Sequence, residues 1–345
     1  MTAQPQSDQP KKILLALQGG AALGAFGWGV LDRLLEDRRL DVEGVSGTSS
    51  GAVNALLVAY GLIGNDRHAA RAVLESFWKR ISEESEKRRW EKLRSIPLLG
   101  SKLFQIRRKE VFLELMSRML LPYQYDPSTM DPLRTVIGET VNFDVLRSSN
   151  AIQLFINATN IATNKNRVFS RDDVSLDAVC ASCCLPFLFD AVEIDGEKYW
   201  DGAYLGNPTV YPLIYECSAS DIILVFSSHL GPKSAPGTSP EIISRICQVS
   251  FTSALVRELR AIKFVTELIE KGYVTGEAGM RKVNIHIIAP SSDDPETGAD
   301  TNFSADWPNL KKVHGRGRHA ADAWLQDNFG LIGQRSTVDL ESLCD

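Results

Sequence analysis

The stretch VEGVSGTSSG at residues 42–51 decides the fold of this chain of 345 residues. Its first four residues are typical of a short buried strand, and residues 52–62 have the composition of a helix. The turn between them has the pattern GxSxG, in which Gly47 and Gly51 flank Ser49. Such a turn raises the serine hydroxyl to the helix N-terminus, where amide dipoles favour developing negative charge. Ser49 is therefore the candidate nucleophile, and a plain tight turn is the alternative interpretation.

A second glycine-rich turn, QGGAALG at residues 18–24, lies upstream of this stretch. It follows the apolar run Ile13–Leu17, which predicts a buried strand, and it precedes apolar residues at helical spacing. Two strand-turn-helix units in succession predict a mainly parallel α/β sheet. Tetrahedral intermediates need pre-aimed N–H donors, and glycines let the backbone turn its amides outward. The predicted oxyanion-hole donors are Gly19, Gly20 and Ala21, and the predicted supporting glycines are Gly24, Gly47 and Gly51.

A third signal is DGA at residues 201–203, which places one carboxylate, Asp201, in a region rich in small residues. The segment ASCCLP precedes it at residues 181–186, and Asn207-Pro208 follows it. A lone Asp-Gly is most often a β-turn. In these surroundings, however, Asp201 and Gly202 are candidates for the functional site.

In this order, the three signals and the segment ASxxxP resemble the patatin-like phospholipase family, from Ile13 to about Ser336. The resemblance implies an α/β fold with three layers, α/β/α, around a mainly parallel central sheet. It also implies cleavage of acyl esters by a Ser-Asp dyad without a catalytic histidine. In that scheme Ser49 is the nucleophile and Asp201 is its base. The implied substrate is a lipid acyl ester, as for a phospholipase A or a lysophospholipase.

Two features of the sequence leave alternatives to this scheme open. The family's loop usually begins with an acid and three glycines and carries an arginine, whereas this chain has Gln18, Ala21 and Leu23. Loss of the arginine removes a bidentate partner for a phosphate. His229 follows the nucleophile and the base in the order of an α/β-hydrolase triad. The alternative functions are an esterase for short acyl chains or storage polyester, and a lipid-binding protein without turnover.

The stretch at residues 67–125 interrupts the strand-helix rhythm and predicts a helical insertion into a single domain over residues 12–336. Its mixed charges are typical of a solvated helical face. Trp90 and Phe104, with basic residues nearby, also suit a lid that rests on an anionic bilayer surface. We expect residues 1–11 to be disordered and residues 337–345 to form a C-terminal tail.

The composition is that of an ordinary globular protein, with 44% hydrophobic and 23% charged residues. A net charge of -5 argues against nucleic acid as a partner. Without a signal-like N-terminus or a long apolar stretch, the expected location is cytoplasmic, with peripheral membrane contact at most. The six cysteines are expected to be reduced, and no spacing of cysteine or histidine suits a metal. No cofactor is expected, because the glycine spacing does not fit a dinucleotide fingerprint. The sequence sets no oligomeric state.

Overall fold

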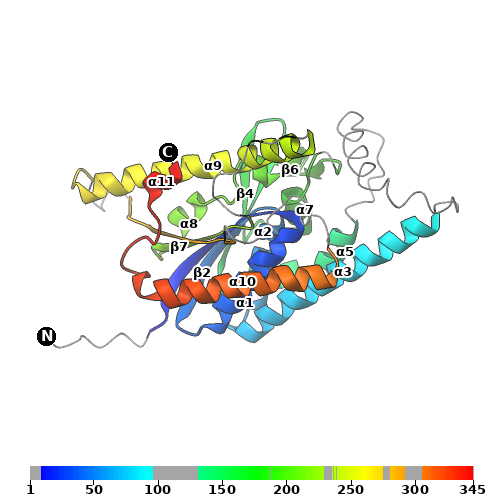
Figure 1. Ribbon diagram of the computed structural model, residues 1–345, viewed down its shortest axis with the longest axis horizontal. Coiled ribbons are helices and arrows are strands. Elements are labelled where there is room, and N and C mark those ends of the chain that lie inside the picture. Colours follow the sequence, from blue (N-terminus) through cyan, green and yellow to red (C-terminus); the bar gives the residue numbers. More distant parts are fainter. Residues whose placement is uncertain are drawn as a thin grey trace.

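The computed structural model describes residues 9–95, 131–186, 188–228, 235, 237, 239–274, 280–291 and 305–344. One sheet forms its centre. The strands are β1 (Lys11–Leu17), β2 (Leu40–Gly47), β3 (Gln153–Asn160), β4 (Lys165–Ser170), β5 (Val192–Ile194), β6 (Glu197–Asp201), β7 (Asp221–Val225) and β8 (Asn284–Ile288). Their order across the sheet is β5-β6-β3-β2-β1-β7-β8, and β4 also pairs with β3 (Figure 1).

The helices lie on both faces of this sheet (Figure 1). They are α1 (Gly24–Glu36), α2 (Ser50–Gly61), α3 (Arg67–Ser95), α5 (Asp131–Thr140), α6 (Phe143–Ser148), α7 (Leu176–Ser182), α8 (Tyr211–Glu216), α9 (Ser239–Glu270), α10 (Trp307–Asn328) and α11 (Leu340–Cys344). Short 3-10 helices in the described ranges are η1 (Ala21–Leu23), η3 (Gly202–Tyr204) and η5 (Phe329–Leu331).

The central strand β1 explains the three layers. Its side chains alternate between two apolar clusters, because successive residues of a strand point to opposite faces. Ile13 and Leu15 pack with α1, α2, α3 and α10 on one face, and Leu14 packs with α8 and α9 on the other. The strands β3, β2, β1, β7 and β8 are all parallel to their neighbours in this part of the sheet. The predicted α/β/α architecture with a mainly parallel sheet is therefore confirmed.

Two strands, β2 and β6, pair with the same edge of β3, one after the other along its length. β4 pairs antiparallel with β3 over most of its length and occupies the opposite edge. On the shared edge, Gly47 of β2 lies opposite Ile156, and Asp201 of β6 lies opposite Ala158. The carboxyl ends of β2 and β6 therefore come together beside β3. This juxtaposition positions the site described below.

The first half of the predicted insertion is part of the fold. α3 packs apolar side chains against α1 and α2, and Trp78 donates from Nε1 to Oδ1 of the buried Asn54 at 3.0 Å. This half packs mainly on the helices α1 and α2 of one layer. The side chain of Trp90 and residues 96–130, with Phe104, lie outside the described residues. The lid therefore stays a prediction.

Both ends of the described chain are tied to the sheet. Lys11, expected in a disordered N-terminus, is the first residue of β1, and its Nζ donates to the carbonyl oxygens of Phe329 and Ile332 at 3.0 and 2.7 Å. Thr337 N donates to Ile285 O at 3.1 Å, and α11 in the predicted tail packs on α9. Within the described residues, no helix has the length and apolar character that crossing a bilayer requires.

Candidate active site

Ser49 occupies a strained turn between β2 and α2. Its backbone has φ 56° and ψ −127°, and a non-glycine residue outside the favoured regions costs about 1–3 kcal/mol. The residue is the N-cap of α2, so its side chain lies at the positive end of the helix dipole. Gly51 permits this turn, because a Cβ atom there would lie 2.2 Å from Leu17 O. The motif GTSSG therefore folds into a sharp strand-to-helix turn with Ser49 at its tip.

Asp201 is a fully buried carboxylate at the end of β6. Its Oδ1 accepts a hydrogen bond from Ala203 N at 2.8 Å, whereas its Oδ2 is buried without a hydrogen-bond partner. Burial raises the pKa of Asp201 to about 7, against the lowering effects of the Ala203 amide and the Ser49 hydroxyl. A carboxylate with this pKa exchanges a proton near neutrality.

The Ser49 hydroxyl and the Asp201 carboxylate are neighbours without a formed hydrogen bond. The hydroxyl is close enough to lower the pKa of Asp201, yet Oδ2 has no partner at hydrogen-bond geometry. Catalytic hydrogen bonds are often long before substrate binds and shorten afterwards. The arrangement follows from β3, which pairs with the strand of each residue on one edge.

The short segment Ser182-Cys183-Cys184 contacts the backbone of both residues. Ser49 N donates to Ser182 Oγ at 3.0 Å, and Asp201 N donates to Cys184 O at 2.7 Å. Burial raises the pKa of the Cys183 thiol well above its ordinary value, so this thiol stays protonated. The segment thus holds the two candidate residues in place. The ASxxxP pattern pointed to this region, but no sequence signal gave Ser182 a specific contact.

The glycine-rich loop donates some of its amides within the protein. Gly19 N donates to Asn207 Oδ1 at 2.7 Å, and Gly20 N donates to Ser50 Oγ at 3.0 Å. Two of the three predicted oxyanion donors are thus engaged, as buried amides generally are. Among the described residues, neither Ala21 N–H nor Ser50 N–H finds an acceptor. Ser50 was not predicted, although the residue after the nucleophile is an ordinary oxyanion donor in a GxSxG turn.

Gln18 has a structural partner that accounts for an amide at this position. Its Oε1 accepts from Ser227 N at 3.0 Å, and the Ser227 hydroxyl donates to Gly19 O at 2.9 Å. These bonds join the loop after β1 to the end of β7. The remaining predicted support residues lie at element boundaries: Gly24 begins α1, Gly47 ends β2 and Gly202 begins η3.

Neither a histidine base nor a metal site is found in the described part of the chain. His229 lies outside the described residues, so the choice between a dyad and a triad stays open at this point. Among the described residues, no three side chains of His, Cys, Asp or Glu converge as metal ligands would. The cysteines at 180, 183, 184, 217 and 247 are free thiols.

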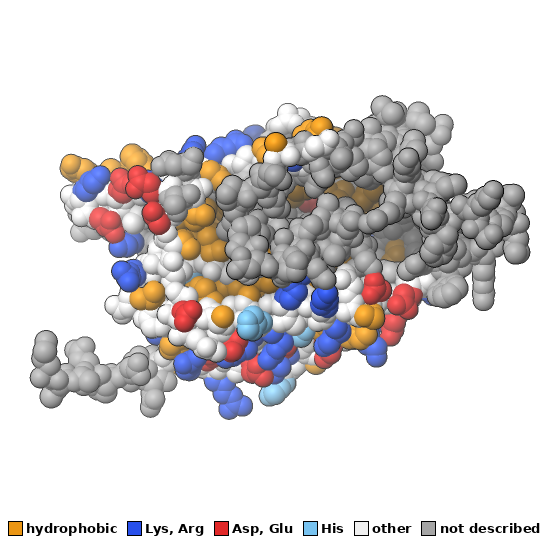
Figure 2. Space-filling model, in the orientation of Figure 1, with side chains coloured by type: hydrophobic (Ala, Val, Ile, Leu, Met, Phe, Trp, Pro, Cys, Tyr) orange, Lys and Arg blue, Asp and Glu red, His pale blue; other side chains and the backbone are white. Residues whose placement is uncertain are grey.

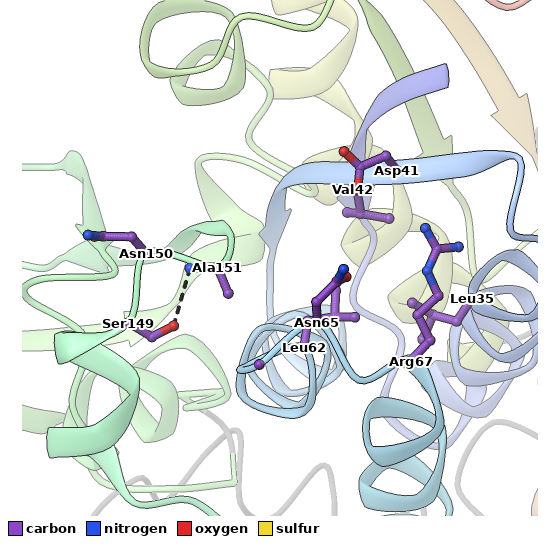
Figure 3. A pocket seen from close by; sticks show the side chains of 10 residues that line it. Leu35, Asp41, Val42, Leu62, Asn65, Arg67, Ser149, Asn150 and Ala151 are labelled. Atoms are coloured by element: carbon purple, nitrogen blue, oxygen red, sulfur yellow. Dashed lines mark hydrogen bonds between the residues drawn. The ribbon is translucent and has the colours of Figure 1, made fainter. Parts of the chain in front are cut away.

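Two cavities in the described residues lie apart from the Ser49 turn. One, of about 540 Å³, is lined by Asp41 and Val42 near the start of β2, together with Asn65 and Arg67 (Figure 3). It is at the opposite end of β2 from Ser49. The other, of about 570 Å³, lies between the end of β8 and α10. Neither cavity contains a predicted site residue.

Comparisons with known proteins found a matching family model and several similar solved structures. A family model described as patatin-like phospholipase matches residues 15–214. Similar solved structures include VipD from Legionella pneumophila, at 15% identity and a TM-score of 0.39, over 91% of this chain and 67% of that chain. Two structures of the ExoU–SpcU complex from Pseudomonas aeruginosa match at 14% and 16% identity, with TM-scores of 0.37 and 0.31. These matches cover 93% and 92% of this chain but only 52% and 53% of those chains. No curated protein sequence matches.

Proposed function

Because this chain belongs to the patatin-like phospholipase family, we propose that it hydrolyses lipid acyl esters through Ser49 and Asp201. Membership in the family supports a lipid acyl hydrolase, and the local geometry supports the two residues. The observation that carries the proposal is the buried Asp201 Oδ2, which has no partner although the Ser49 hydroxyl is its neighbour. A buried acceptor without a partner is costly, and a catalytic role is one explanation for it. The place of this oxygen beside the Ser49 hydroxyl favours that explanation here.

In the first half of the proposed reaction, Asp201 Oδ2 takes the proton of Ser49 Oγ as Oγ attacks the carbonyl carbon of the ester. The carbonyl electron pair moves to oxygen and forms an oxyanion. When the intermediate collapses, the bond to the alcohol breaks, and the leaving oxygen takes the proton from Asp201. The acyl group is then joined to Ser49. A pKa of about 7 for Asp201 suits both transfers, because the group is near half ionised at neutrality.

In the second half, a water molecule replaces the alcohol. Asp201 Oδ2 takes a proton from the water as its oxygen attacks the acyl carbon, and a second oxyanion forms. Collapse of this intermediate breaks the bond to Ser49 Oγ, which regains its proton from Asp201. The products are a free acid and the original enzyme. No cofactor enters either half.

The amides of Ala21 and Ser50 are the proposed donors to the oxyanion. Both lack an acceptor among the described residues, and Ser50 also lies at the positive end of α2. The amides of Gly19 and Gly20 can join only if substrate oxygen replaces Asn207 Oδ1 or Ser50 Oγ. Each such donor is typically worth about 10²–10³ in turnover.

Two alternatives share this fold. A short-chain or storage-polyester esterase would use the same dyad on a different acyl group. A lipid-binding protein without turnover is favoured only by the altered glycine loop, and the strained Ser49 beside Asp201 argues against it. We therefore favour phospholipids and lysophospholipids as substrates.

A lipid panel tests the proposal directly. The purified protein is incubated with phospholipids, lysophospholipids, short-chain esters and polyester, and released acids are identified by mass spectrometry. Wild type should release fatty acids and should be labelled by a fluorophosphonate, whereas Ser49→Ala should do neither. Release by wild type that persists in Ser49→Ala would overturn the nucleophile. No release from any ester would favour the lipid-binding alternative.

A further inference from the structure

The long helix α9 has an unusual outer face. Its inner face buries Leu255, Leu259 and Ile262 in the second apolar cluster of the core. The outer side chains recur at spacings of three, four, seven or eight residues and so form one stripe along the helix. This outer stripe consists of Ile242, Ile246, Val249, Arg257, Arg260 and Phe264, all of which are exposed.

The outer stripe is apolar and basic, whereas an ordinary surface helix has a polar outer face. Ile246 and Val249 are each 60% exposed, and Phe264 is 62% exposed. Figure 2 shows hydrophobic side chains near both ends of α9 along the upper left edge of the molecule, with basic side chains between them and acidic side chains below the left end. The acidic Glu258 does not belong to this face, because it accepts from Val210 N at 2.8 Å at the start of α8.

The basic part of the stripe contrasts with the acidic chain as a whole. Arg257 donates to Ser253 O and Oγ, both at 3.2 Å, and these are neutral acceptors on the same helix. The charge of its guanidinium is therefore not neutralised by these bonds. In a chain of net charge -5, the exposed Arg257 in line with exposed aliphatic residues matches an anionic lipid surface.

The apolar end of the stripe is adjacent to the candidate active site. Phe251 of α9 makes an edge-to-face contact with Tyr204, with ring centroids 5.1 Å apart. Tyr204 belongs to η3, which follows Asp201 directly. Val249 and Ile246 precede Phe251 on α9 by two and five residues, so no more than about one and a half helical turns separate them from the contact with Tyr204.

We propose that the outer stripe of α9 docks on an anionic lipid bilayer and so brings the active site to the membrane surface. This inference rests on the proposed function for its substrate, but the docking itself does not need turnover. Amphipathic helices of this type insert aliphatic side chains at the boundary between headgroups and acyl chains, while arginines remain among the headgroups. Ile242, Ile246 and Val249 are the inserted residues.

The test measures vesicle binding in a Ser49→Ala background, which separates docking from hydrolysis. Phosphatidylcholine vesicles, with and without phosphatidylglycerol, are sedimented with the protein, and the bound fraction gives a partition coefficient. The triple variant Ile242→Ser, Ile246→Ser, Val249→Ser should lower the coefficient on the order of 100-fold, because three aliphatic side chains no longer insert. Arg257→Gln should lower it about fivefold on anionic vesicles only.

A control variant carries Val145→Ser and Tyr215→Ser, which are exposed at other places, and it should bind as the parent does. The triple variant with Ser49 restored should hydrolyse a soluble short-chain ester normally. Equal vesicle binding by the triple and parent proteins, or no binding by the parent, would overturn the docking surface. A parent dimer that the triple variant converts to a monomer in light scattering would instead assign the stripe to self-association. Vesicle binding without release of fatty acid by wild type would contradict the proposed function and leave the docking surface intact.

Discussion

The partly buried Asp32 and the fully buried Asp201 have pKa values that the protein shifts in opposite directions. Asp32, on α1, accepts from Arg71 and Arg318 at 2.5 Å each and is 3.1 Å from His314 Nε2. Burial alone would raise its pKa, but the hydrogen bonds from His314, Arg71 and Arg318 lower it far below the ordinary value. Asp201 has one backbone donor and an Oδ2 without a partner, and burial raises its pKa to about 7.

The contrast separates the part of the molecule that stabilises the fold from the part that works against stability. The network of Asp32 joins α1, α3 and α10, which form one outer layer. The carboxyl edge of the sheet carries the strained Ser49 and the unpaired oxygen of Asp201. Natural proteins break local rules mainly at functional sites, and here two such exceptions lie beside one another.

The largest expected effect is on turnover. Asp201→Asn should lower kcat/KM by about 10²–10⁴, because the base is lost while the shape is kept. Asp32→Asn should leave the rate per folded molecule within about tenfold, since an outer-layer network does not touch the reaction. Initial rates on a lipid ester, corrected for the folded fraction by circular dichroism, measure both. His229→Ala serves as a further control, and a loss as severe as that of Asp201→Asn would replace the dyad with a triad.

The same two variants should change stability in opposite directions. Asp32→Asn should lower the free energy of unfolding by roughly 2–4 kcal/mol, because Arg71 and Arg318 lose their carboxylate partner. Asp201→Asn should raise it by roughly 1–3 kcal/mol at pH 8, because a buried charge becomes neutral while Ala203 N keeps its acceptor. Urea unfolding followed by circular dichroism gives both values. A destabilised Asp201→Asn variant would contradict this interpretation of the site.

The contributions of the two aspartates to the free energy of unfolding should change in two separate pH ranges. The pKa of Asp201 is raised on folding, so its contribution to stability is present at low pH and is lost as the pH rises from about 4 to about 7. The pKa of Asp32 is lowered, so its contribution is lost as the pH falls below about 4. Activity should rise through about pH 7 as Asp201 ionises. For each Asn variant, the difference from wild type in the free energy of unfolding, measured with urea across pH, isolates the contribution of that aspartate. A single pH range shared by both aspartates would contradict this prediction.

A histidine triad would also lose activity below about pH 6.5. The pH profile of activity therefore does not separate dyad from triad, since burial brings Asp201 into the same range. The variants at positions 201 and 229 make that distinction.

The smallest effect concerns the segment that holds the Ser49 turn. Ser182→Ala removes the acceptor of Ser49 N and should lower kcat about tenfold with KM little changed, because a donor is left unpaired. Ser46→Ala is the matched control, since the buried Ser46 Oγ has no partner, and it should be neutral or slightly stabilising. Steady-state kinetics with equal losses in both variants would mean that Ser182 only packs.

The parallel core could be predicted from the sequence because its signals are local. Ile13–Leu17 is a continuous apolar run, as expected for a strand buried on both faces, and glycines mark the turns that follow. The antiparallel edge could not be predicted in this way. β4 and β6 read KNRVFS and EKYWD, which are short and rich in polar residues. Their position depends on pairing with β3, and no local pattern encodes such a contact.

The candidate site could likewise be predicted only in part. The motifs identified the residue types, because Ser49 and Asp201 lie in turns with recognisable small neighbours. The hydrogen bonds of the glycine loop could not be predicted, because Asn207 and Ser50 reach Gly19 and Gly20 only in the folded chain. Ser50 is the exception, since its position after the nucleophile was already visible in GTSSG.

The edge of β3 that carries both β2 and β6 also affects the order of events in folding. Ile156 and Ala158 pair with residues distant in the chain, and such contacts form slowly because long loops must close first. The hydrogen bonds within a helix, in contrast, join residues only four apart in the chain. Hydrolytic activity should therefore return after denaturation later than the helical circular dichroism signal does. That delay measures the time that β6 needs to pair with β3 and so to bring Asp201 beside Ser49.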